Sequence, residues 1–344
     1  MKTSMKAAVL QSFGQALALL DLPVPEPLPD EVLIEVEACG VCHSDLHIVD
    51  GDTPGFKAGT KAQLIPGHEV VGRVVARGAK VSHLALGQRV GVAWLHHACG
   101  VCDLCVGGRE NLCRKGSVTG MTVDGGYAEF MRAKASHALP IPDALDSVAA
   151  APLFCAGVTS YRALHQAGVG PGQRVAVVGV GGLGHLAVQI AVAAGAEVIA
   201  LDVADDKLAA ARALGAAHAF DARAPDTPKA VRALGGVHLA VVTSAARAAY
   251  EVALKCLRPA GTLSIVGLPP EPLQFSALAL VSGEFRILGS AVGTRDDVRA
   301  TLALAAAGKL HCQCHTRPLA EANAALDDLR GGRIQGRTVL VTTR

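Results

Sequence analysis

The sequence has little of what marks a nucleic-acid-binding or membrane-bound chain. Its 32 Lys and Arg residues nearly balance its 30 Asp and Glu residues, so the net charge is only +2, and no basic block occurs. Such a balance creates no field that would attract nucleic acid or an acidic membrane. The N-terminal stretch also lacks an apolar run that ends in a small-residue cleavage site. We therefore expect no nucleic-acid partner, no membrane association and a cytoplasmic location.

Internal repeats and long low-complexity linkers are absent as well. Charged residues make up only 18% of the chain and hydrophobic residues 51%, which excludes a disordered or coiled-coil chain. The 344 residues suffice for two domains, each with its own core. Residues 175–201 form one long apolar segment, but it contains five glycines. A strand, a glycine turn and a helix explain this segment better than a membrane span does.

The pattern of the chain changes near its middle. Up to about residue 150, strand-like runs at 32–38, 70–76 and 89–93 are broken by proline and glycine. From about residue 170, strands alternate with Ala-rich helices. The expected strands are 175–178, 198–201, 238–243 and 262–266, and the expected helices begin near Gly182 or span 207–214 and 248–257. A helix at 296–307 and a strand at 338–341 follow. This alternation predicts a parallel sheet covered by helices.

Four of the ten cysteines crowd into fifteen residues: Cys99, Cys102, Cys105 and Cys113. Four thiolates close a tetrahedral zinc site and leave no position for substrate, so such a site is structural. An iron–sulfur cluster uses the same ligands, and the cluster alone does not exclude a zinc-ribbon binding module. The crowding favours metal thiolates in a reducing compartment over disulfides.

A second set of metal-binding residue types is dispersed along the chain. Catalytic zinc takes three protein ligands and keeps a fourth position open, and Cys42, His68 and Cys155 would provide such a set. Spacing alone leaves this open. A histidine beside a Pro-Gly pair is more often a turn residue, and an isolated cysteine is more often a small core residue.

A glycine-rich loop lies between an expected strand and an expected helix. Gly179, Gly181 and Gly184 form a G-x-G-x-x-G motif, which provides the turn, the close approach to a pyrophosphate and the helix–strand packing. Asp202 follows 18 residues after Gly184, at the end of the next strand, where a carboxylate accepts from ribose hydroxyls. Its charge favours NAD over NADP. The alternative is that Asp202 caps the following helix.

Together these motifs resemble the zinc-dependent medium-chain alcohol dehydrogenase family, particularly its shorter bacterial and yeast-like branch. The resemblance covers nearly the whole chain. It rests on Cys42-His43-Ser44-Asp45-Leu46-His47, Gly67-His68-Glu69, the four clustered cysteines, Cys155-Ala156-Gly157-Val158-Thr159, and the glycine loop with Asp202.

This resemblance implies an α/β fold. A doubly wound Rossmann domain at residues 153–291 would be inserted into a mostly β, GroES-like catalytic domain at 1–152 and 292–344, with the active site in the cleft. The protein would be an NAD-dependent zinc alcohol dehydrogenase. It would interconvert primary or secondary alcohols with aldehydes or ketones, with two zinc ions per chain, and would form a homotetramer.

The resemblance also implies residue roles. Cys42, His68 and Cys155 would bind a catalytic zinc that acts as a Lewis acid on the substrate oxygen, with Glu69 behind it as an occasional ligand. Asp45 would orient His68, and Ser44 and His47 would carry the substrate proton. The cofactor would contact His43, Thr159, Gly179, Gly181, Gly182, Leu183, Gly184, Asp202 and Lys207, and Trp94 would line the substrate pocket. Without the resemblance, His47 is explained as a turn cap and Trp94 as a core aromatic.

Rival functions share parts of these motifs. A zinc-free quinone or enoyl reductase would not need Cys42, His68 and Cys155. A zinc-ribbon binding protein would need neither these residues nor the glycine loop. A polyol or formaldehyde-type dehydrogenase is the closest alternative, because it differs only in its substrate pocket.

The sequence departs from the family pattern at three places. Residues 48–53 contain no aromatic residue, whereas yeast-like members commonly have tryptophan there, so we expect a pocket wider than an ethanol-sized one. The pair His96-His97 is unusual before the clustered cysteines. The stretch His311-Cys312-Gln313-Cys314-His315 suggests a third metal, but we interpret it as a strand with alternating Cys and His side chains.

Overall fold

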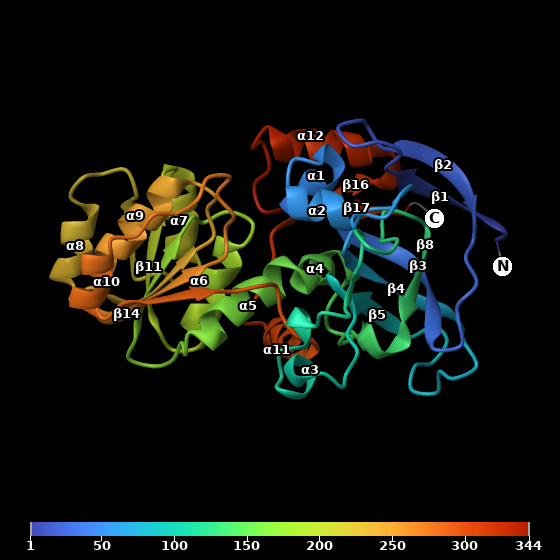
Figure 1. Cartoon of the computed structure of the whole chain (residues 1–344), viewed down its shortest axis with the longest axis horizontal. Coiled ribbons are helices and arrows are strands. Elements are labelled where there is room, and N and C mark those ends of the chain that lie inside the picture. Colours follow the sequence, from blue (N-terminus) through green and yellow to red (C-terminus); the bar gives the residue numbers. More distant parts are fainter. Residues whose placement is uncertain (1, 343–344) are drawn as a thin grey trace. The chain divides into compact units, whose positions relative to one another are not determined.

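The computed structural model describes residues 2–342 and divides into two compact units (Figure 1). Unit 1 comprises the chain up to Cys155, Thr294–Ala306 and the chain from Cys312 onward, whereas unit 2 comprises Ala156–Gly293 and Ala307–His311. Unit 2 is therefore an insertion in the sequence of unit 1.

Unit 1 is built mainly from strands. They are β1 (Ser4–Val9), β2 (Ala18–Pro23), β3 (Glu31–Gly40), β4 (Glu69–Arg77), β5 (Arg89–Val92), β6 (Leu95–His97), β7 (Ser117–Val118), β8 (Phe130–Lys134), β9 (Ala138–Pro140), β16 (Cys314–Pro318) and β17 (Arg337–Val341). Its helices are α1 (His43–Asp50), α2 (Pro54–Gly59), α3 (Asp103–Val106), α4 (Ser147–Ala150), α11 (Arg295–Ala306) and α12 (Ala322–Arg330). The short 3₁₀ helices are η1 (Glu110–Leu112), η2 (Ala135–His137), η3 (Ala151–Phe154) and η4 (Leu319–Glu321).

The largest sheet of unit 1 follows the order β16-β17-β3-β4-β5-β9, and β8 also pairs with β3. Strands β3 and β4 lie at its centre, where apolar side chains such as Ile34, Val70 and Val74 are fully buried. Their antiparallel pairing places Gly40 opposite Glu69. Because Cys42 follows β3 by two residues and His68 directly precedes β4, this register brings the two residues together.

Unit 2 contains a parallel six-stranded sheet in the order β12-β11-β10-β13-β14-β15. The strands are β10 (Arg174–Val178), β11 (Glu197–Asp202), β12 (His218–Asp221), β13 (Val237–Val242), β14 (Leu257–Ile265) and β15 (Arg286–Gly289). The helices are α5 (Ala156–Gln166), α6 (Gly184–Ala193), α7 (Asp205–Ala213), α8 (Thr227–Ala233), α9 (Arg247–Cys256) and α10 (Ala277–Gly283). In Figure 1 helices flank this sheet on both faces. The strand order reverses between β10 and β13, which is where a doubly wound sheet binds its ligand.

The inner strands β10, β11 and β13 of unit 2 are near-continuous runs of buried apolar residues, as a sheet covered on both faces requires. The structure confirms the predicted fold class, a Rossmann unit inserted into a mostly β unit. The apolar segment 175–201 is β10, a glycine loop, α6 and β11. Between residues 2 and 342, no helix has the length and apolarity to cross a membrane.

The strand expected at residues 311–315 is wrong in its first half, because β16 begins only at Cys314. The backbone of His311 is already bound elsewhere. Its N–H donates to Gln189 Oε1 at 2.8 Å, and its carbonyl accepts from Gln189 Nε2 at 2.9 Å. This segment therefore cannot offer the backbone groups that a continuous ladder needs. The other predicted strands and helices are present, with ends shifted by a few residues.

Candidate active site

Four buried side chains converge in unit 1: Cys42, His68, Glu69 and Cys155. Each contributes a ligand-type atom, and these atoms lie within 4.8 Å of one another. The Sγ atoms of Cys42 and Cys155 are 3.9 Å apart, and His68 Nε2 lies 3.2 Å from Cys155 Sγ. Cys155 reaches the group because η3, which ends one residue before it, packs against β3 and β4.

A fully buried carboxylate, that of Asp45, connects the segments that carry these residues. It accepts from the Cys42 backbone N–H at 3.0 Å and from the Gly67 backbone N–H at 3.1 Å. It also lies 2.9 Å from His68 Nδ1 and accepts from the Tyr127 hydroxyl at 3.2 Å. With Nδ1 donating to Asp45, the Nε2 lone pair of His68 faces the other three residues, as a metal-ligating histidine requires.

Gly67 is needed for this arrangement. Its backbone has φ of +95°, which favours glycine, and a Cβ there would lie 2.4 Å from the Tyr127 ring and 2.8 Å from Cys39 Sγ. A larger residue would displace the neighbouring His68. The family resemblance implied the role of Asp45, but Tyr127, which lies 82 residues from Asp45 in the chain, carried no local signal.

The electrostatics of the group favour a cation. Burial disfavours a charged imidazole, yet the Asp45 carboxylate and the Cys42 thiol hold the pKa of His68 well above its usual value. The neighbouring Cys155 thiol holds the pKa of Cys42 well below its usual value, and the same contact raises the pKa of Cys155. Burial raises the pKa of Glu69 to about 8 although Arg337 opposes it. Around this site, two thiols and two carboxyl groups are balanced by only two basic groups, the His68 imidazole and the Arg337 guanidinium. A bound cation would therefore be stabilised there.

Glu69 forms a buried ion pair with Arg337 of β17, which is only 3% exposed. The sequence did not indicate Arg337, because its partner lies 268 residues away. The Oε2 atom of Glu69 is buried and has no hydrogen-bond partner among the described residues. A carboxylate, two sulfurs and one imidazole nitrogen, with ligand atoms within 4.8 Å of one another, suit a tetrahedral zinc ion.

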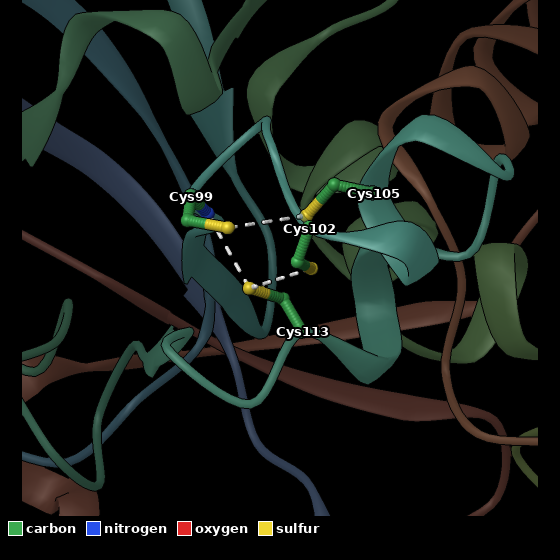
Figure 2. Close-up of side chains that lie close together, drawn as sticks. All are labelled: Cys99, Cys102, Cys105 and Cys113. Carbon is green, nitrogen blue, oxygen red and sulfur yellow. Dashed lines mark hydrogen bonds between the residues drawn. The ribbon is translucent and has the colours of Figure 1, made fainter.

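The four clustered cysteines lie on the loop between β6 and β7, which includes the short helix α3, and they point toward one another (Figure 2). Their Sγ atoms lie within 4.8 Å of one another, with Cys99 to Cys105 at 3.9 Å and Cys102 to Cys113 at 4.0 Å. Hydrogen bonds from the backbone of Val101 and of Cys102 lower the pKa of Cys99 to about 6. These two backbone N–H groups therefore favour the thiolate form of Cys99. Four sulfurs and no other ligand type also match the predicted structural zinc site.

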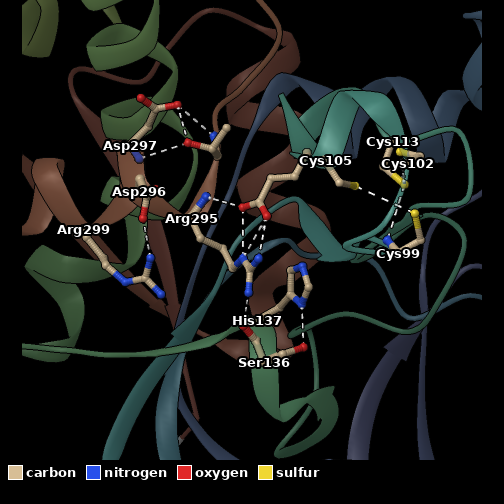
Figure 3. Close-up of polar contacts among 12 residues, drawn as sticks. Cys99, Cys102, Cys105, Cys113, Ser136, His137, Arg295, Asp296, Asp297 and Arg299 are labelled. Carbon is tan, nitrogen blue, oxygen red and sulfur yellow. Dashed lines mark hydrogen bonds and ion pairs between the residues drawn. The ribbon is translucent and has the colours of Figure 1, made fainter. Parts of the chain in front are cut away.

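The cysteine loop is anchored to helix α11 (Figure 3). Glu110, in η1 between Cys105 and Cys113, accepts from the Arg295 backbone N–H and from Arg295 Nε, both at 2.9 Å. Arg295 Nη1 donates to the Ser136 carbonyl at 3.0 Å. Burial alone would raise the pKa of Glu110, but the hydrogen bonds from Arg295 outweigh it and hold that pKa below its usual value. This pair ties the loop to the first residue of α11.

In unit 2 the glycine loop follows β10 directly. Gly179 has φ of +91°, and a Cβ at Gly184 would lie 1.8 Å from the Gly179 carbonyl oxygen, so only glycine allows α6 to begin this close to β10. A Cβ at Gly181 would meet nothing within 4 Å, so this part of the backbone is open to a ligand. Gly182 and Leu183 complete the turn, and Leu183 precedes α6 as its N-cap residue. An open backbone before a helix N-terminus suits a pyrophosphate.

Asp202 ends β11 and is 6% exposed. Its carboxylate accepts from the backbone N–H of Val180 at 2.6 Å, of Val203 at 2.7 Å and of Ala204 at 3.1 Å. The N-cap residue of α7 is Ala204, so Asp202 is not the cap that the alternative required. Instead Asp202 fixes the glycine loop, a role that the sequence did not indicate. Lys207 lies in the first turn of α7.

The other predicted residues occupy two helices. His43 and Ser44 open α1 directly after Cys42, and Thr159, which is 8% exposed, lies in the first turn of α5. His47 follows one turn later in α1, and its Nδ1 lies 2.9 Å and 3.0 Å from the two carboxylate oxygens of Asp52. Asp52 is a partner that sequence reasoning missed.

Trp94 lies next to the four-residue group. Its ring meets the His68 ring edge to face at a centroid distance of 4.9 Å, and it meets the Phe56 ring at 5.7 Å. Trp94 therefore contacts a site residue, as its predicted place in a substrate pocket requires. Phe56 adds an aromatic ring just beyond residues 48–53, where the sequence has none.

The sequence matches two protein-family descriptions. "Alcohol dehydrogenase GroES-like domain" matches residues 28–143, and "Zinc-binding dehydrogenase" matches residues 182–307. Among curated proteins, the alcohol dehydrogenase of Geobacillus stearothermophilus is 45% identical over 337 residues, covering 98% of this chain and 99% of its own length. That of Rhizobium meliloti (strain 1021) is 44% identical over 338 residues, with 98% of both chains covered.

Solved structures give the same result. The alcohol dehydrogenase of Aeropyrum pernix has a TM-score of 0.89 at 36% identity and covers 98% of this chain and 99% of its own. The acetophenone reductase of Geotrichum candidum, solved in complex with NAD, has a TM-score of 0.89 at 32% identity. The match covers 99% of this chain and 98% of the reductase chain. Both family descriptions match, and relatives that share the fold align over nearly the whole chain. The chain therefore belongs to the zinc-dependent medium-chain alcohol dehydrogenase family of oxidoreductases.

Proposed function

We propose that the protein oxidises small primary or secondary alcohols and reduces the corresponding aldehydes or ketones, with NAD as hydride carrier. The observation that carries this proposal is the buried group of Cys42, His68, Glu69 and Cys155, held by Asp45. When bound there, zinc supplies a Lewis acid for the substrate oxygen, and the nicotinamide of NAD accepts or donates the hydride. The identities of 43–45% to curated alcohol dehydrogenases support the same reaction. We propose the four-cysteine cluster as the site of a second, structural zinc.

The chain's own residues would manage the proton of the alcohol. Ser44 lies two residues after Cys42, and its hydroxyl has one donor and two lone pairs, enough to receive a proton and pass one on. His47 lies one turn further along α1, and its side chain is 34% exposed, so it can release a proton to solvent. Asp52 accepts from His47 Nδ1 and thereby leaves Nε2 as the acceptor for that proton. We propose Ser44 and His47 as catalytic residues and Asp52 as their positioning residue.

We further propose that unit 2 holds NAD through its glycine loop, with Asp202, Lys207, Thr159 and His43 as additional contacts. The open backbone at Gly181 and the glycine-only approach of α6 to β10 support a pyrophosphate there. The proposed domains remain residues 1–152 with 292–344 for catalysis and 153–291 for NAD. Residues 1, 343 and 344 of these ranges lie outside the described chain.

A homotetramer in the cytoplasm is the proposed state of the protein. Among residues 2–342, strand β15 pairs with β14 alone. Exposed apolar side chains occur in β15, in α10 and after β14: Ile287, Leu278, Val281 and Leu268. An exposed apolar region of this kind supports self-association. None of the ten cysteines, all of which lie within residues 2–342, forms a disulfide, which supports a reducing compartment.

Metal analysis tests the two proposed zinc sites. We expect two zinc ions per chain by plasma mass spectrometry. Cys42→Ser should abolish turnover and keep one zinc and a native circular-dichroism spectrum, because it damages only the buried group. Cys105→Ser should mainly lower the melting temperature, because four-cysteine sites stabilise the fold. Iron in place of zinc, or a single zinc that only Cys105→Ser removes, would contradict this assignment.

Cofactor preference tests the role of Asp202. A 2′-phosphate would meet the carboxylate, so kcat/KM should be higher with NAD than with NADP, and Asp202→Gly should narrow the difference. Because Asp202 also accepts three backbone N–H groups, Asp202→Asn is the matched variant. Asp202→Asn removes the charge and keeps an acceptor oxygen. It should narrow the difference in kcat/KM between NAD and NADP and destabilise the fold less than Asp202→Gly does. Equal use of NAD and NADP by the unmodified protein would refute the proposal.

Variants of the proton path test the relay. General acid–base help is worth about 10²–10⁴-fold, so Ser44→Ala should lower the rate of alcohol oxidation by about 100-fold. His47→Gln should lower it less and mainly below neutral pH, because at higher pH hydroxide in the solvent removes the proton directly. Small imidazole buffers should restore part of the His47→Gln rate. Asp52→Asn should lower the rate of alcohol oxidation in the same pH range as His47→Gln, but by a smaller factor.

An unchanged pH–rate profile in His47→Gln, with no rescue by imidazole, would remove His47 from the mechanism. Thr53→Ala serves as the matched control, because Thr53 donates to the same Asp52 carboxylate at 3.0 Å but lies outside the proposed path. Its pH–rate profile should equal that of the unmodified enzyme.

A further inference from the structure

Two cysteines, Cys312 and Cys314, have no part in the sites described above. They are separated by one residue, and both side chains are half-buried. The Sγ atom of Cys314 lies 3.5 Å from the Cys312 carbonyl oxygen and 3.6 Å from the Val148 carbonyl oxygen. The Cys314 thiol is thus folded back over Cys312. The exposure of both side chains leaves them accessible to a small reagent.

A buried cation lies beside this pair. In the parallel pairing of β16 and β17, Cys314 is the partner of Arg337, whose backbone N–H donates to the Gln313 carbonyl at 2.8 Å. The neighbouring Cys312 thiol lowers the pKa of Cys314 against the effect of burial, and Arg337 adds to this lowering. The pKa of Cys312 is raised by the same contact. Cys314 therefore gives up its proton more readily than Cys312, and Cys312 is the second thiol, separated from Cys314 by one residue along the chain.

The other cysteines outside the two metal-type groups differ from this pair. Cys39 and Cys256 are fully buried, so a reagent in solution cannot reach either thiol. Burial raises the pKa of Cys256 to about 11. A buried thiol with a raised pKa is chemically inert. Reactive cysteines that sense oxidants have the opposite features: thiolate character, exposure and an adjacent second cysteine.

We propose that Cys312 and Cys314 form a dithiol site that a peroxide, such as hydrogen peroxide, oxidises to an intramolecular disulfide. In the first step the Cys314 thiolate attacks one peroxide oxygen and the O–O bond breaks. The other oxygen leaves and takes up a proton to form water, and Cys314 becomes a sulfenic acid. In the second step Cys312 attacks the Cys314 sulfur, the S–S bond forms, the S–O bond breaks, and a second water leaves.

The overall change is the loss of two electrons and two protons by the thiols, which reduce one peroxide to two waters. A third metal site at the same residues is disfavoured. Among the described residues, the groups able to hold a metal do not include Cys312 or Cys314. This inference is independent of the proposed dehydrogenase reaction. Arg337 pairs with Glu69 of the buried four-residue group and is the register partner of Cys314 in the pairing of β16 and β17.

Peptide mass spectrometry on the zinc-loaded full-length protein tests the proposal. The protein is titrated with hydrogen peroxide, free thiols are blocked with N-ethylmaleimide, and the chain is cut with trypsin. Cleavage after Lys309 releases a peptide that contains Cys312 and Cys314 and no other cysteine. We expect this peptide to lose two hydrogens and both alkylation sites. Its oxidation should be about ten times faster than that of Cys256, and dithiothreitol should reverse it.

Two variants separate the steps. Cys312→Ser should stop after the first step, so Cys314 should be captured by dimedone as a sulfenic acid. Cys314→Ser should leave Cys312 reduced, and the matched control Cys256→Ala should form the disulfide at the unchanged rate. A peptide that keeps both thiols at doses that already oxidise Cys256 would overturn the proposal. Direct conversion of Cys314 to a sulfinic acid without a disulfide would also overturn it. Both of these outcomes are measured on the unmodified protein, so they do not depend on whether a variant folds.

Discussion

The buried carboxylate of Asp45 is the contact on which the candidate site depends. It joins α1, the turn before β4 and the Tyr127 side chain through four hydrogen-bonding partners. A buried carboxylate is costly unless its lone pairs are used, and here each oxygen has two partners. The same contacts place Cys42 and His68 side by side and set the tautomer of His68. The antiparallel register of β3 and β4 brings the two segments close enough for Asp45 to bridge them.

Two further ion pairs stabilise the segments around this centre. Arg337 of β17 compensates part of the charge of Glu69, which would otherwise be a buried carboxylate next to two thiols. Arg295 of α11 holds Glu110 in the loop of the four cysteines. Helix α11 in turn packs against η3, which ends directly before Cys155. Both groups of metal-type ligands thus rest on elements that come from distant parts of the sequence, and each depends on correct packing of unit 1.

The sequence indicated directly those parts of the site whose signals are local, whereas the dispersed residues His68 and Cys155 were assigned through the family resemblance. The four clustered cysteines, the Cys42 to His47 motif and the glycine loop between a strand and a helix all lie within short windows, so spacing alone restricts their geometry. Tyr127 and Arg337 were missed because the sheet register and tertiary packing determine their partners. The strand expected at 311–315 was wrong because the Gln189 side chain binds the backbone of His311. Alternating residue types cannot reveal such a competing contact.

The central claim is that Asp45 holds the buried residues as a metal site separate from the four-cysteine cluster. Zinc retention by Asp45→Asn, measured against a competing chelator, tests it most directly. The variant keeps the size of the side chain but removes the charge that fixes His68. Loss of such a partner lowers metal affinity by about 10–100-fold, so one zinc per chain should dissociate much more readily while the other is retained. Unchanged retention of both ions, or equal weakening of both, would contradict the account.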